Sequence, residues 1–573
     1  MEKQWIVLAG EEAGPKSNKL GGIWEVIDAE TATLASLISK GELNDNAKVI
    51  VTGPYYRCDG CDWNTEQNRL TKLDGLKKLS PDKDLEKAIN AIDKTWTEVK
   101  TGAKIVDGVE IAYVLFDTDK YLTSQGTYKD QELLFADEVK MEAHKLIGLD
   151  SLNYERTGYG KEYTHYLNLS HAISQFVRLL ALSGRVSLHC HEFGVFYVAA
   201  RLKKLRAPNV KTVATFHATK VGRSWGAEVI KKIARNDGTW HPYTALGLAQ
   251  LESMAKYFDA VTCVGDTTRM EARLFYGIDS MVVRNGIRLE TDTINWEKRV
   301  KCRDKIQKFL SKNMHEFYDG EEVDPEHILP IFTISRIELE NKGYPDLLDA
   351  LVLYDRALRN RIRNGEVDED TIAVCIMITS HGPKQRDRLP KGFPVYLPEE
   401  LLMGNELRLK KMILEHELET RRIVTERRVV SAVEYPQWVG KNDGGFGMTV
   451  DEIAAGCIAG IFPSRYDPFL LTGLEAGKEG TPVIVSRVCG FSDAVREYVK
   501  KKGIMGGVIV VDNIKLPYLE SVADYAMGLD SITTAYLRDK SKYRMMSQEA
   551  FNLAKDMSWV DPVKKYYEVL SIK

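Results

Sequence analysis

The amino-acid sequence predicts an α/β protein with two Rossmann-like domains that face each other across a cleft, and with a helical insertion in the second domain. Short apolar runs rich in β-branched residues alternate with helical stretches, which is typical of parallel sheets joined by crossover helices. The alternation comes in two series. A chain of 573 residues is also too long for one core, since domains usually have about 100–200 residues.

Strands of the first series are expected at Trp5–Ala9, Lys48–Thr52, Ile111–Phe116, Val186–His191, Thr212–His217, Ala260–Val264 and Met281–Arg284. Those of the second series are expected at Leu329–Ile334, Ile372–Ile378, Gly460–Phe462, Pro482–Val485 and Gly507–Val511. The charged stretch after Asn285-Gly286 suits a boundary. We therefore expect an N-terminal domain at 1–295, completed by a C-terminal helix at 559–573, and a second domain at 296–558.

The segment from about 399 to 430 interrupts the second series. Apolar residues recur among charges here, which predicts an amphipathic helix or helix pair inserted in the second domain. Such a helix either packs on its own domain or contacts another subunit.

Composition excludes several classes of protein. Hydrophobic residues make up 44% and charged residues 28%, and the net charge of −3 gives no reason to expect nucleic acid or an acidic membrane as a partner. The N-terminal apolar run is too short for a signal peptide, and no run reaches the roughly 18 residues that a membrane span needs. The eight cysteines are spread out, which suits the cytoplasm, and Cys58-Asp59-Gly60-Cys61 has no second pair for zinc, so two free thiols are expected.

The stretch from Ile461 to Glu475 is the most informative part of the sequence. An apolar strand breaks at Pro463, and a helix is expected to begin near Thr472, a good N-cap residue. Asp467 on the loop and Glu475 on the helix then lie in a crevice at the carboxyl end of a parallel strand, where open α/β sheets bind ligands and a helix start favours phosphate. The alternative is a strand-to-helix corner whose two acids simply face water.

The order acid-Pro-aromatic, Thr, Glu in this stretch resembles the Glu-x7-Glu signature of retaining GT-B glycosyltransferases. Together with Phe462-Pro463-Ser464 and the later Gly-x-Pro-Val-Ile, it resembles the animal and fungal glycogen synthases (glycosyltransferase family 3), whose motif reads Glu-Pro-Trp-Gly-Tyr-Thr-Pro-Ala-Glu. The resemblance implies a GT-B fold and transfer of glucose, with retention, from a nucleotide sugar (UDP-glucose or ADP-glucose) to the non-reducing end of an α-1,4-glucan. It implies that the first domain binds the acceptor and the second the nucleotide sugar. It also implies no metal or other cofactor, and a homo-oligomer.

The resemblance also implies roles for the residues of this stretch. Asp467 would contact sugar hydroxyls and Glu475 the ribose hydroxyls, while Phe469 lines the donor pocket. Thr472 and the N–H of Gly473 would receive phosphate.

Four further motifs occur in the family's order. Lys19-Leu20-Gly21-Gly22 resembles its glycine pair before a helix, where the backbone can approach phosphate closely; by itself a Gly-Gly is more often a turn. His189-Cys190-His191-Glu192 resembles His-Phe-His-Glu, whose residues line the cleft. A metal reading of it is set aside because Glu192 lies on the opposite side of an extended chain from the two histidines.

Thr215-Phe216-His217-Ala218-Thr219-Lys220-Val221-Gly222-Arg223 resembles Thr-Thr-His-Ala-Thr-Leu-Leu-Gly-Arg almost letter for letter. By this resemblance His217 meets the donor sugar and Arg223 the phosphate end of the cleft; the alternative for His217 is a hydrogen-bonded core histidine. Arg336 and Lys342 match the family's Arg-x5-Lys-Gly and suit a leaving diphosphate, whereas an isolated surface charge pair would contribute little. Because these groups come from both domains, donor binding is expected to close the cleft.

The sequence departs from the family at the donor end. Asp467 replaces Glu, Phe469-Leu470-Leu471 replaces Trp-Gly-Tyr, and Val450 stands where the family has a tyrosine that stacks on uracil. Glucose 6-phosphate activation is not expected, because only four cations remain in Tyr536–Arg544. Two alternatives follow. One is a retaining GT-B transferase with another donor or a small-molecule or other glycan acceptor, and the other is a non-catalytic relative that binds glycan or nucleotide sugar.

Overall fold

The structure is a computed structural model of the whole chain. It describes residues 3–570 except 20, 45, 57–70, 95, 120, 122–124, 129–130, 152–159, 227, 231–246, 318–322, 381–401, 403, 419–426, 435–445 and 504–505. The Cys58–Cys61 motif lies outside these residues. Within the part described, no helix combines the length and the apolar character that crossing a membrane requires.

The chain divides into two compact units. Unit 1 contains Met1–Trp225, Asp237–Gly286 and Trp559–Lys573, and unit 2 contains Gly226–Asn236 and Ile287–Ser558. The long chain crossings therefore fall after Gly286 and after Ser558. The boundaries expected from the sequence were after residues 295 and 558.

Unit 1 is built on an eight-stranded sheet with the order β10-β9-β8-β7-β1-β2-β4-β3, in which only β3 runs antiparallel to its neighbour. Its strands are β1 (Gln4–Gly10), β2 (Ala47–Pro54), β3 (Glu98–Val106), β4 (Val109–Asp117), β7 (Arg185–His191), β8 (Val210–Phe216), β9 (Ala260–Cys263) and β10 (Met281–Val282), with a separate hairpin of β5 (Gln125–Tyr128) and β6 (Gln131–Leu134). Its helices are α1 (Gly22–Ser39), α2 (Lys83–Asn90), α4 (Phe135–Ile147), α6 (Gly160–Leu180), α7 (Tyr197–Lys204), α8 (Lys220–Trp225), α10 (Gly247–Glu252), α11 (Asp266–Tyr276) and α20 (Val560–Leu570).

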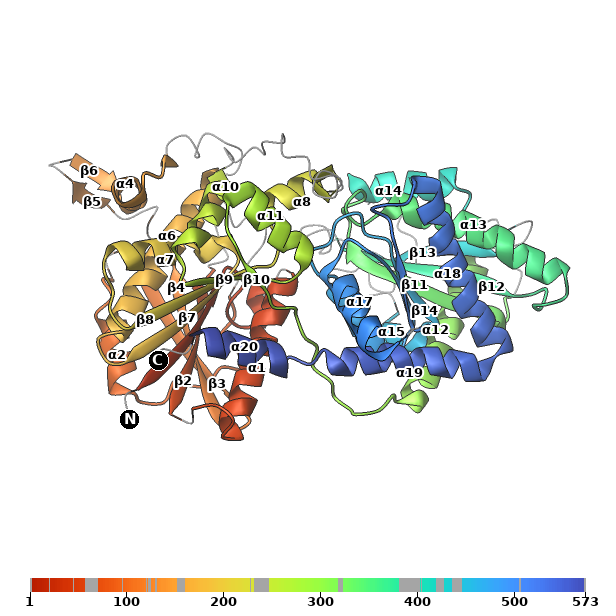
Figure 1. Ribbon diagram of the computed structural model, residues 1–573, viewed down its shortest axis with the longest axis horizontal. Helices are drawn as coiled ribbons and strands as arrows, with labels where there is room; N and C mark the ends of the chain where they lie inside the picture. Colours follow the sequence, from red (N-terminus) through yellow and green to blue (C-terminus); the bar gives the residue numbers. More distant parts are fainter. Residues whose placement is uncertain are drawn as a thin grey trace. The chain divides into compact units, whose positions relative to one another are not determined.

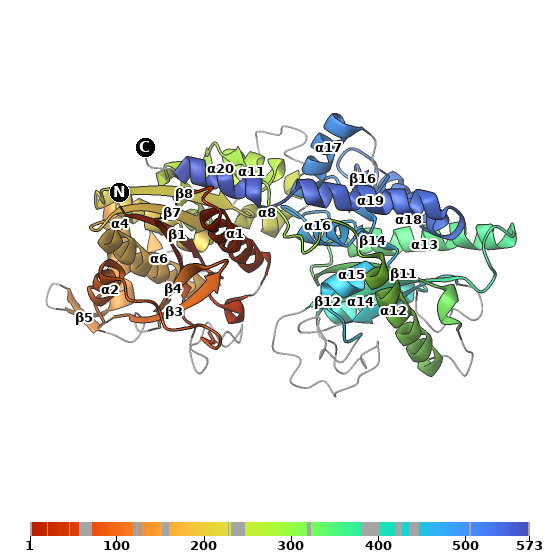
Figure 2. The ribbon, with the colours of Figure 1, turned by 90° about the horizontal axis from the view of Figure 1, so that it is seen from below.

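Helices cover both faces of this sheet (Figures 1 and 2). Helices α1, α11 and the C-terminal helix α20 lie on one face, where α20 packs on β7, β8 and α1. Helices α2, α6 and α7 cover the other face. Trp559, which precedes α20, is buried. The central strands are apolar on both faces, since residues Trp5 to Ala9 of β1 are all fully buried.

Unit 2 is built on a six-stranded, fully parallel sheet with the order β13-β12-β11-β14-β15-β16. Its strands are β11 (Ile328–Arg336), β12 (Ile372–Ser380), β13 (Val429–Glu434), β14 (Ala459–Phe462), β15 (Val483–Ser486) and β16 (Val508–Val511). Its helices are α12 (Trp296–Phe317), α13 (Tyr344–Arg363), α14 (Asn405–Glu415), α15 (Val450–Gly456), α16 (Leu471–Lys478), α17 (Gly490–Lys502), α18 (Tyr518–Arg538) and α19 (Lys540–Asp556).

These two α/β units confirm the predicted fold class. Every predicted strand is present, but β3, β13 and the hairpin strands β5 and β6 were not predicted. In the stretch from 399 to 430, the described residues form α14 and the start of β13. Leu409 and Ile413 of α14 are buried in the core of unit 2, as in the domain-packing alternative.

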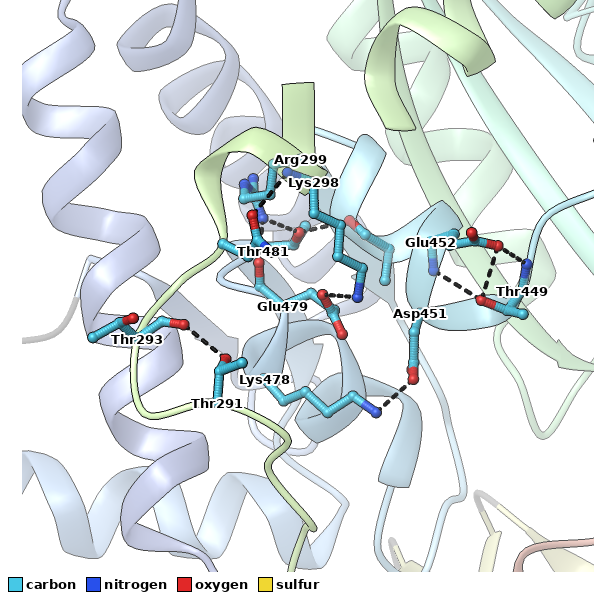
Figure 3. A network of polar contacts seen from close by, with 12 residues as sticks. Thr291, Thr293, Lys298, Arg299, Thr449, Asp451, Glu452, Lys478, Glu479 and Thr481 are labelled. Carbon is cyan, nitrogen blue, oxygen red and sulfur yellow. Dashed lines mark hydrogen bonds and ion pairs between the residues drawn. The ribbon is translucent and has the colours of Figure 1, made fainter. Parts of the chain in front are cut away.

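A polar network fixes the C-terminal end of α16 within unit 2 (Figure 3). Lys298 of α12 donates to Glu479 at 2.6 Å, and the buried Arg299 donates to the Glu479 carbonyl at 2.7 Å and to Thr481 Oγ1 at 2.6 Å. Lys478 bonds Asp451 of α15 at 2.7 Å. Helix α16 is therefore held at the end opposite to the loop that carries Asp467.

Candidate active site

Both sheets have a topological switch point, the place where successive crossovers change direction and open sheets bind ligands. In unit 2 it lies between β11 and β14, because β12 and β13 follow on one side and β15 and β16 on the other. In unit 1 it lies between β1 and β7. Most of the predicted site residues lie on the loops at the carboxyl ends of these four strands and of β8.

At the unit 2 switch point, Lys342 and Asp467 form an ion pair. Lys342 Nζ lies 2.7 Å from Asp467 Oδ2, and the two side chains are 15% and 13% exposed. Asp467 Oδ1 accepts the backbone N–H groups of Phe469 at 3.3 Å and Leu470 at 2.8 Å. One carboxylate thus ties the loop after β11 to the start of α16, and the predicted phosphate cation is held beside the predicted sugar-binding acid.

Gly343 makes this approach possible. Its φ is +65°, and a Cβ built there would lie 1.9 Å from the Pro463 carbonyl oxygen, so no other residue fits. Arg465 braces the same two loops by donating to Asp346 at 2.6 Å and Glu340 at 2.7 Å. Sequence reasoning missed Arg465, whose acidic partners lie more than a hundred positions away.

We expect Gly343→Ala to destabilise unit 2 and to disrupt the Lys342–Asp467 pair. The left-handed backbone alone costs about 1–3 kcal/mol for a residue with a Cβ, and the clash with Pro463 adds to that. Thermal unfolding should show a lower Tm, whereas Gly365→Ala, with φ +70° and open space around it, measures the backbone cost alone. Equal Tm losses in the two variants would show that the clash is not real.

The start of α16 differs from the prediction. The helix begins at Leu471 and its N-cap is Leu470, with φ 71° and ψ 63°, rather than Thr472. The cause is Asp467, which accepts the N–H of Leu470 and closes the turn before Thr472 is reached. Thr472 and Glu475 lie within the helix, half-buried. Leu470 is the residue that replaces the family's glycine, and it adopts the left-handed conformation that glycine favours.

The aromatic part of this loop points into the structure. Phe469 is 4% exposed, and its carbonyl accepts the N–H of Phe491 at 2.9 Å. A Cβ on Gly473 would lie 3.0 Å from the Phe491 ring and 3.4 Å from Leu470 Cδ2, so Gly473 permits this packing. The ligand-binding roles predicted for Phe469 and Gly473 remain predictions.

Arg336, at the end of β11, is not part of the Lys342–Asp467 pair. Its side chain is 56% exposed and forms an ion pair with Glu338 at 3.1 Å. Exposed pairs of this kind contribute little to stability, so the guanidinium can turn toward a ligand at low cost.

In unit 1, the start of α1 is closed by a carboxylate of the chain itself. Glu12 accepts the backbone N–H of Gly21 at 2.8 Å, and Lys19 forms an ion pair with Glu25. Gly22 is the first residue of the helix. Binding of phosphate at Lys19, Gly21 and Gly22 would therefore require Glu12 to move away from the donors it now caps.

Glu192 follows β7 in a strained conformation. Its φ is +69°, its carboxylate is 1% exposed, and neither oxygen has a hydrogen bond to any residue that the structure describes. Arg223 Nη2 lies 3.5 Å from Glu192 Oε2. Burial raises the pKa of Glu192 well above its usual value, Arg223 counteracts this, and Glu252 and Glu11 add to it. Backbone strain and an unbonded buried acid are typical of functional sites.

His191 and His217, which belong to two of the predicted motifs, lie together. Nδ1 of His191 is 3.1 Å from Nε2 of His217, and both side chains are buried. Behind them, Glu30 of α1 contacts His189 Nδ1 at 2.8 Å and His191 Nε2 at 3.3 Å. Sequence reasoning missed Glu30, as it missed Glu11 and Glu252. Helical spacing could have shown an acid on the apolar face of α1.

Glu252 carries a pH-dependent contribution to stability. It is buried, and burial raises its pKa to about 7 although the hydroxyl of Tyr276 and the N–H of Lys220 donate to it. The folded chain holds this proton up to about pH 7, whereas the unfolded chain releases it near pH 4.5. The contribution is therefore fully present below pH 4.5 and is lost as the pH rises through 7.

We expect Glu252→Gln to remove this pH dependence, which amounts to at most about 3 kcal/mol. Tm measured from pH 4.5 to 8 should fall less with rising pH in the variant than in the parent chain. An unchanged pH profile would show that Glu252 does not titrate in this range.

Comparison with known proteins gives these sites their context. A family model described as "Glycosyltransferase Family 4" matches residues 153–291, and one described as "Glycogen synthase" matches residues 410–567, including the Asp467 loop. Glycogen [starch] synthase isoform 1 of Saccharomyces cerevisiae is 22% identical over 90% of this chain and 80% of its own length. The liver glycogen [starch] synthase of Homo sapiens is 22% identical over 89% of this chain and 76% of its own length.

This chain is related to the animal and fungal glycogen synthases. It is a glycosyltransferase with the GT-B fold, in agreement with its structural neighbours. The catalytic domain of starch synthase IV from Arabidopsis thaliana has a TM-score of 0.52 at 14% identity and covers 100% of this chain and 99% of its own. A trehalose-phosphate synthase from Burkholderia xenovorans has a TM-score of 0.51 at 10% identity and covers 99% of this chain and 98% of its own.

Proposed function

We propose that this glycogen synthase relative transfers glucose, with retention of configuration, from a nucleotide sugar to the non-reducing end of an α-1,4-glucan. The observation that carries the proposal is the Lys342–Asp467 pair at the switch point of unit 2. There a cation and an acid lie side by side at the position where α/β sheets bind ligands. The loop carrying Asp467 lies within the region matched by the glycogen synthase model.

We assign the leaving diphosphate to Arg336 and Lys342. As the bond from C1 of glucose to the diphosphate breaks, negative charge grows on the phosphate oxygens, and positioned cations stabilise that charge. Lys342 can bind phosphate once its contact with Asp467 loosens, which frees the Asp467 carboxylate for sugar hydroxyls. Glu475 would bind the ribose, with Thr472 and the start of α16 near the phosphate.

We assign sugar contacts to unit 1 through Glu192 and His217, with Arg223 beside Glu192. The unbonded oxygens of Glu192 can accept hydrogen bonds from sugar hydroxyls, and such bonds would offset the cost of burying that acid. The acceptor hydroxyl attacks on the face that the phosphate leaves, and the leaving phosphate takes its proton. This route needs no carboxylate nucleophile.

Incubation with glycogen and radiolabelled UDP-glucose or ADP-glucose tests the proposal, and the ratio of the two rates identifies the base. Label should enter polymer that α-amylase digests. Absence of incorporation from both donors, with the protein folded, would contradict the glucan assignment.

We further propose that the enzyme is cytoplasmic and forms a homo-oligomer, with UDP-glucose as the preferred donor. The resemblance to glycogen synthases supports all three statements. Light scattering coupled to gel filtration measures the subunit number, and a mass of one 64.8 kDa chain would contradict the oligomer.

A further inference from the structure

A buried line of polar groups runs from α1 across β7 to β8 in unit 1. Glu30 Oε1 is 2.8 Å from His189 Nδ1, and Glu30 Oε2 is 3.3 Å from His191 Nε2. His191 Nδ1 is 3.1 Å from Nε2 of His217. Glu30 and both strand histidines are at most 1% exposed, and His217 is 7% exposed. His217 is therefore the end of the line that lies nearest to solvent.

The contact between Glu30 Oε2 and His191 Nε2 is electrostatic rather than a hydrogen bond, since neither atom has a hydrogen-bond partner among the described residues. The charge of Glu30 therefore decides where the ring hydrogens lie. Burial by itself would raise the pKa of Glu30, but the neighbouring His189 and His191 lower it by more than burial raises it. The carboxylate is therefore ionised and can only accept hydrogen bonds. A hydrogen on Nε2 of His191 is attracted by this carboxylate, whereas a lone pair there would be repelled, so the hydrogen lies on Nε2. Burial lowers the pKa of His191 to about 4, so the ring is neutral and its Nδ1 is an acceptor.

The hydrogen between the two rings must therefore belong to Nε2 of His217. Burial, followed by the neighbouring His191, holds the pKa of His217 well below its usual value, so this ring is neutral as well. A neutral imidazole with its hydrogen on Nε2 has an unprotonated Nδ1, which can accept a hydrogen bond. Among the described groups, Glu30 determines this tautomer of His217 through one intervening residue, His191.

The position of Glu30 indicates more than packing. Its neighbours on the buried face of α1 include Ile23, Val26, Ile27 and Leu34, all apolar. Replacing a buried ion pair by apolar residues of similar volume is often neutral or stabilising, so a buried charge among these apolar residues is weak evidence for a role in stability.

We propose that Glu30 is a positioning residue, which through His191 fixes the tautomer of His217 so that His217 offers Nδ1 as a hydrogen-bond acceptor to a hydroxyl of the transferred sugar. The sugar contact rests on the proposed function; the tautomer does not. His189 supports the arrangement because its Nε2 lies 2.6 Å from Thr215 Oγ1, and its ring lies against Tyr566 of α20.

A metal ion is the competing occupant of this cluster. Ligand atoms of Glu30, His189 and His191 all lie within 4.8 Å of one another. The 2.8 Å contact between Glu30 and His189 has the length of a hydrogen bond, and the described residues supply these three ligands where structural zinc takes four. A proton therefore fits the geometry better than a metal.

Two variants test the proposal. Glu30→Gln keeps the shape and removes the charge, and Glu30→Leu removes the polar group altogether. Histidine ¹⁵N chemical shifts report the tautomer directly, with His217→Asn assigning the signals. We expect His217 to be protonated on Nε2 in the parent chain, and to become a mixture or the Nδ1 form in both variants.

In the same variants kcat should fall about 10- to 100-fold, with donor KM within a few-fold. This is the loss typical of removing a residue that orients a metal-ligating side chain, which we take as the analogy for Glu30 behind His191. Asp28→Asn, on the same helix, is the matched control and should change neither readout. An unchanged His217 tautomer in Glu30→Gln, or one zinc per chain in the purified protein, would overturn the proposal. If the parent chain transfers no glucose, the proposed function fails while the shifts still decide the tautomer.

Discussion

Replacing Arg336 by alanine is expected to lower kcat by about 30- to 1000-fold, equivalent to 2–4 kcal/mol, while leaving Tm and glycogen affinity nearly unchanged. The guanidinium is 56% exposed and its pair with Glu338 contributes little to folding, so its loss costs little in the resting protein. The charge it stabilises appears only as the diphosphate leaves. Removal should therefore affect the transition state more than substrate binding.

Steady-state kinetics with varied donor, together with glycogen binding, measures this effect. Arg273→Ala is a matched control, since Arg273 is also exposed and its pair with Asp279 spans 3.7 Å. Near-parental kcat in Arg336→Ala would show that Arg336 is only a surface charge.

Replacing Lys342 by alanine should reduce both activity and stability. We expect kcat/KM to fall at least about 100-fold, because a cation for the diphosphate is lost. We also expect Tm to fall, because Asp467 stays mostly buried without its charged partner. This joint loss distinguishes Lys342 from Arg336, which should affect activity alone.

A double-mutant cycle with Asp467→Asn separates the two effects of Lys342. The stability losses of the single variants should not add, because both break the same pair. Lys298→Ala breaks a comparable pair with Glu479, at 2.6 Å, and serves as the control for stability without loss of the diphosphate cation. If Lys342→Ala lowers Tm as Lys298→Ala does but keeps full activity, Lys342 is structural.

Local sequence patterns predicted the fold well where strands are buried on both faces. Strand β1 is an example, because it is a continuous apolar run that is followed by a helical segment. Strand β3 was missed because it is an edge strand whose Lys100 and Lys104 break the apolar pattern. Strand β13 was missed because its first residues end a charged, helix-like segment. In both cases the pairing with a neighbouring strand decides the structure, and pairing is not visible locally.

The candidate site was likewise predicted where local patterns decide the structure, and missed where contacts between distant residues decide it. The motifs predicted which residues follow the strands of each switch point, because loops at the carboxyl ends of parallel strands share one edge. They did not predict that Lys342 is held by Asp467, that Glu12 caps α1, or that Glu30 lies behind His191. Those contacts join residues distant in the sequence, and no spacing rule encodes them.

Transfer of glucose onto glycogen with retained configuration is the most direct test of the central claim. Chain ends extended from ¹³C1-labelled nucleotide glucose should show an α-linked anomeric carbon by NMR, and the signal should be lost in Lys342→Ala. A folded, donor-binding protein that extends no α-glucan, or that forms a β-linkage, would contradict the account.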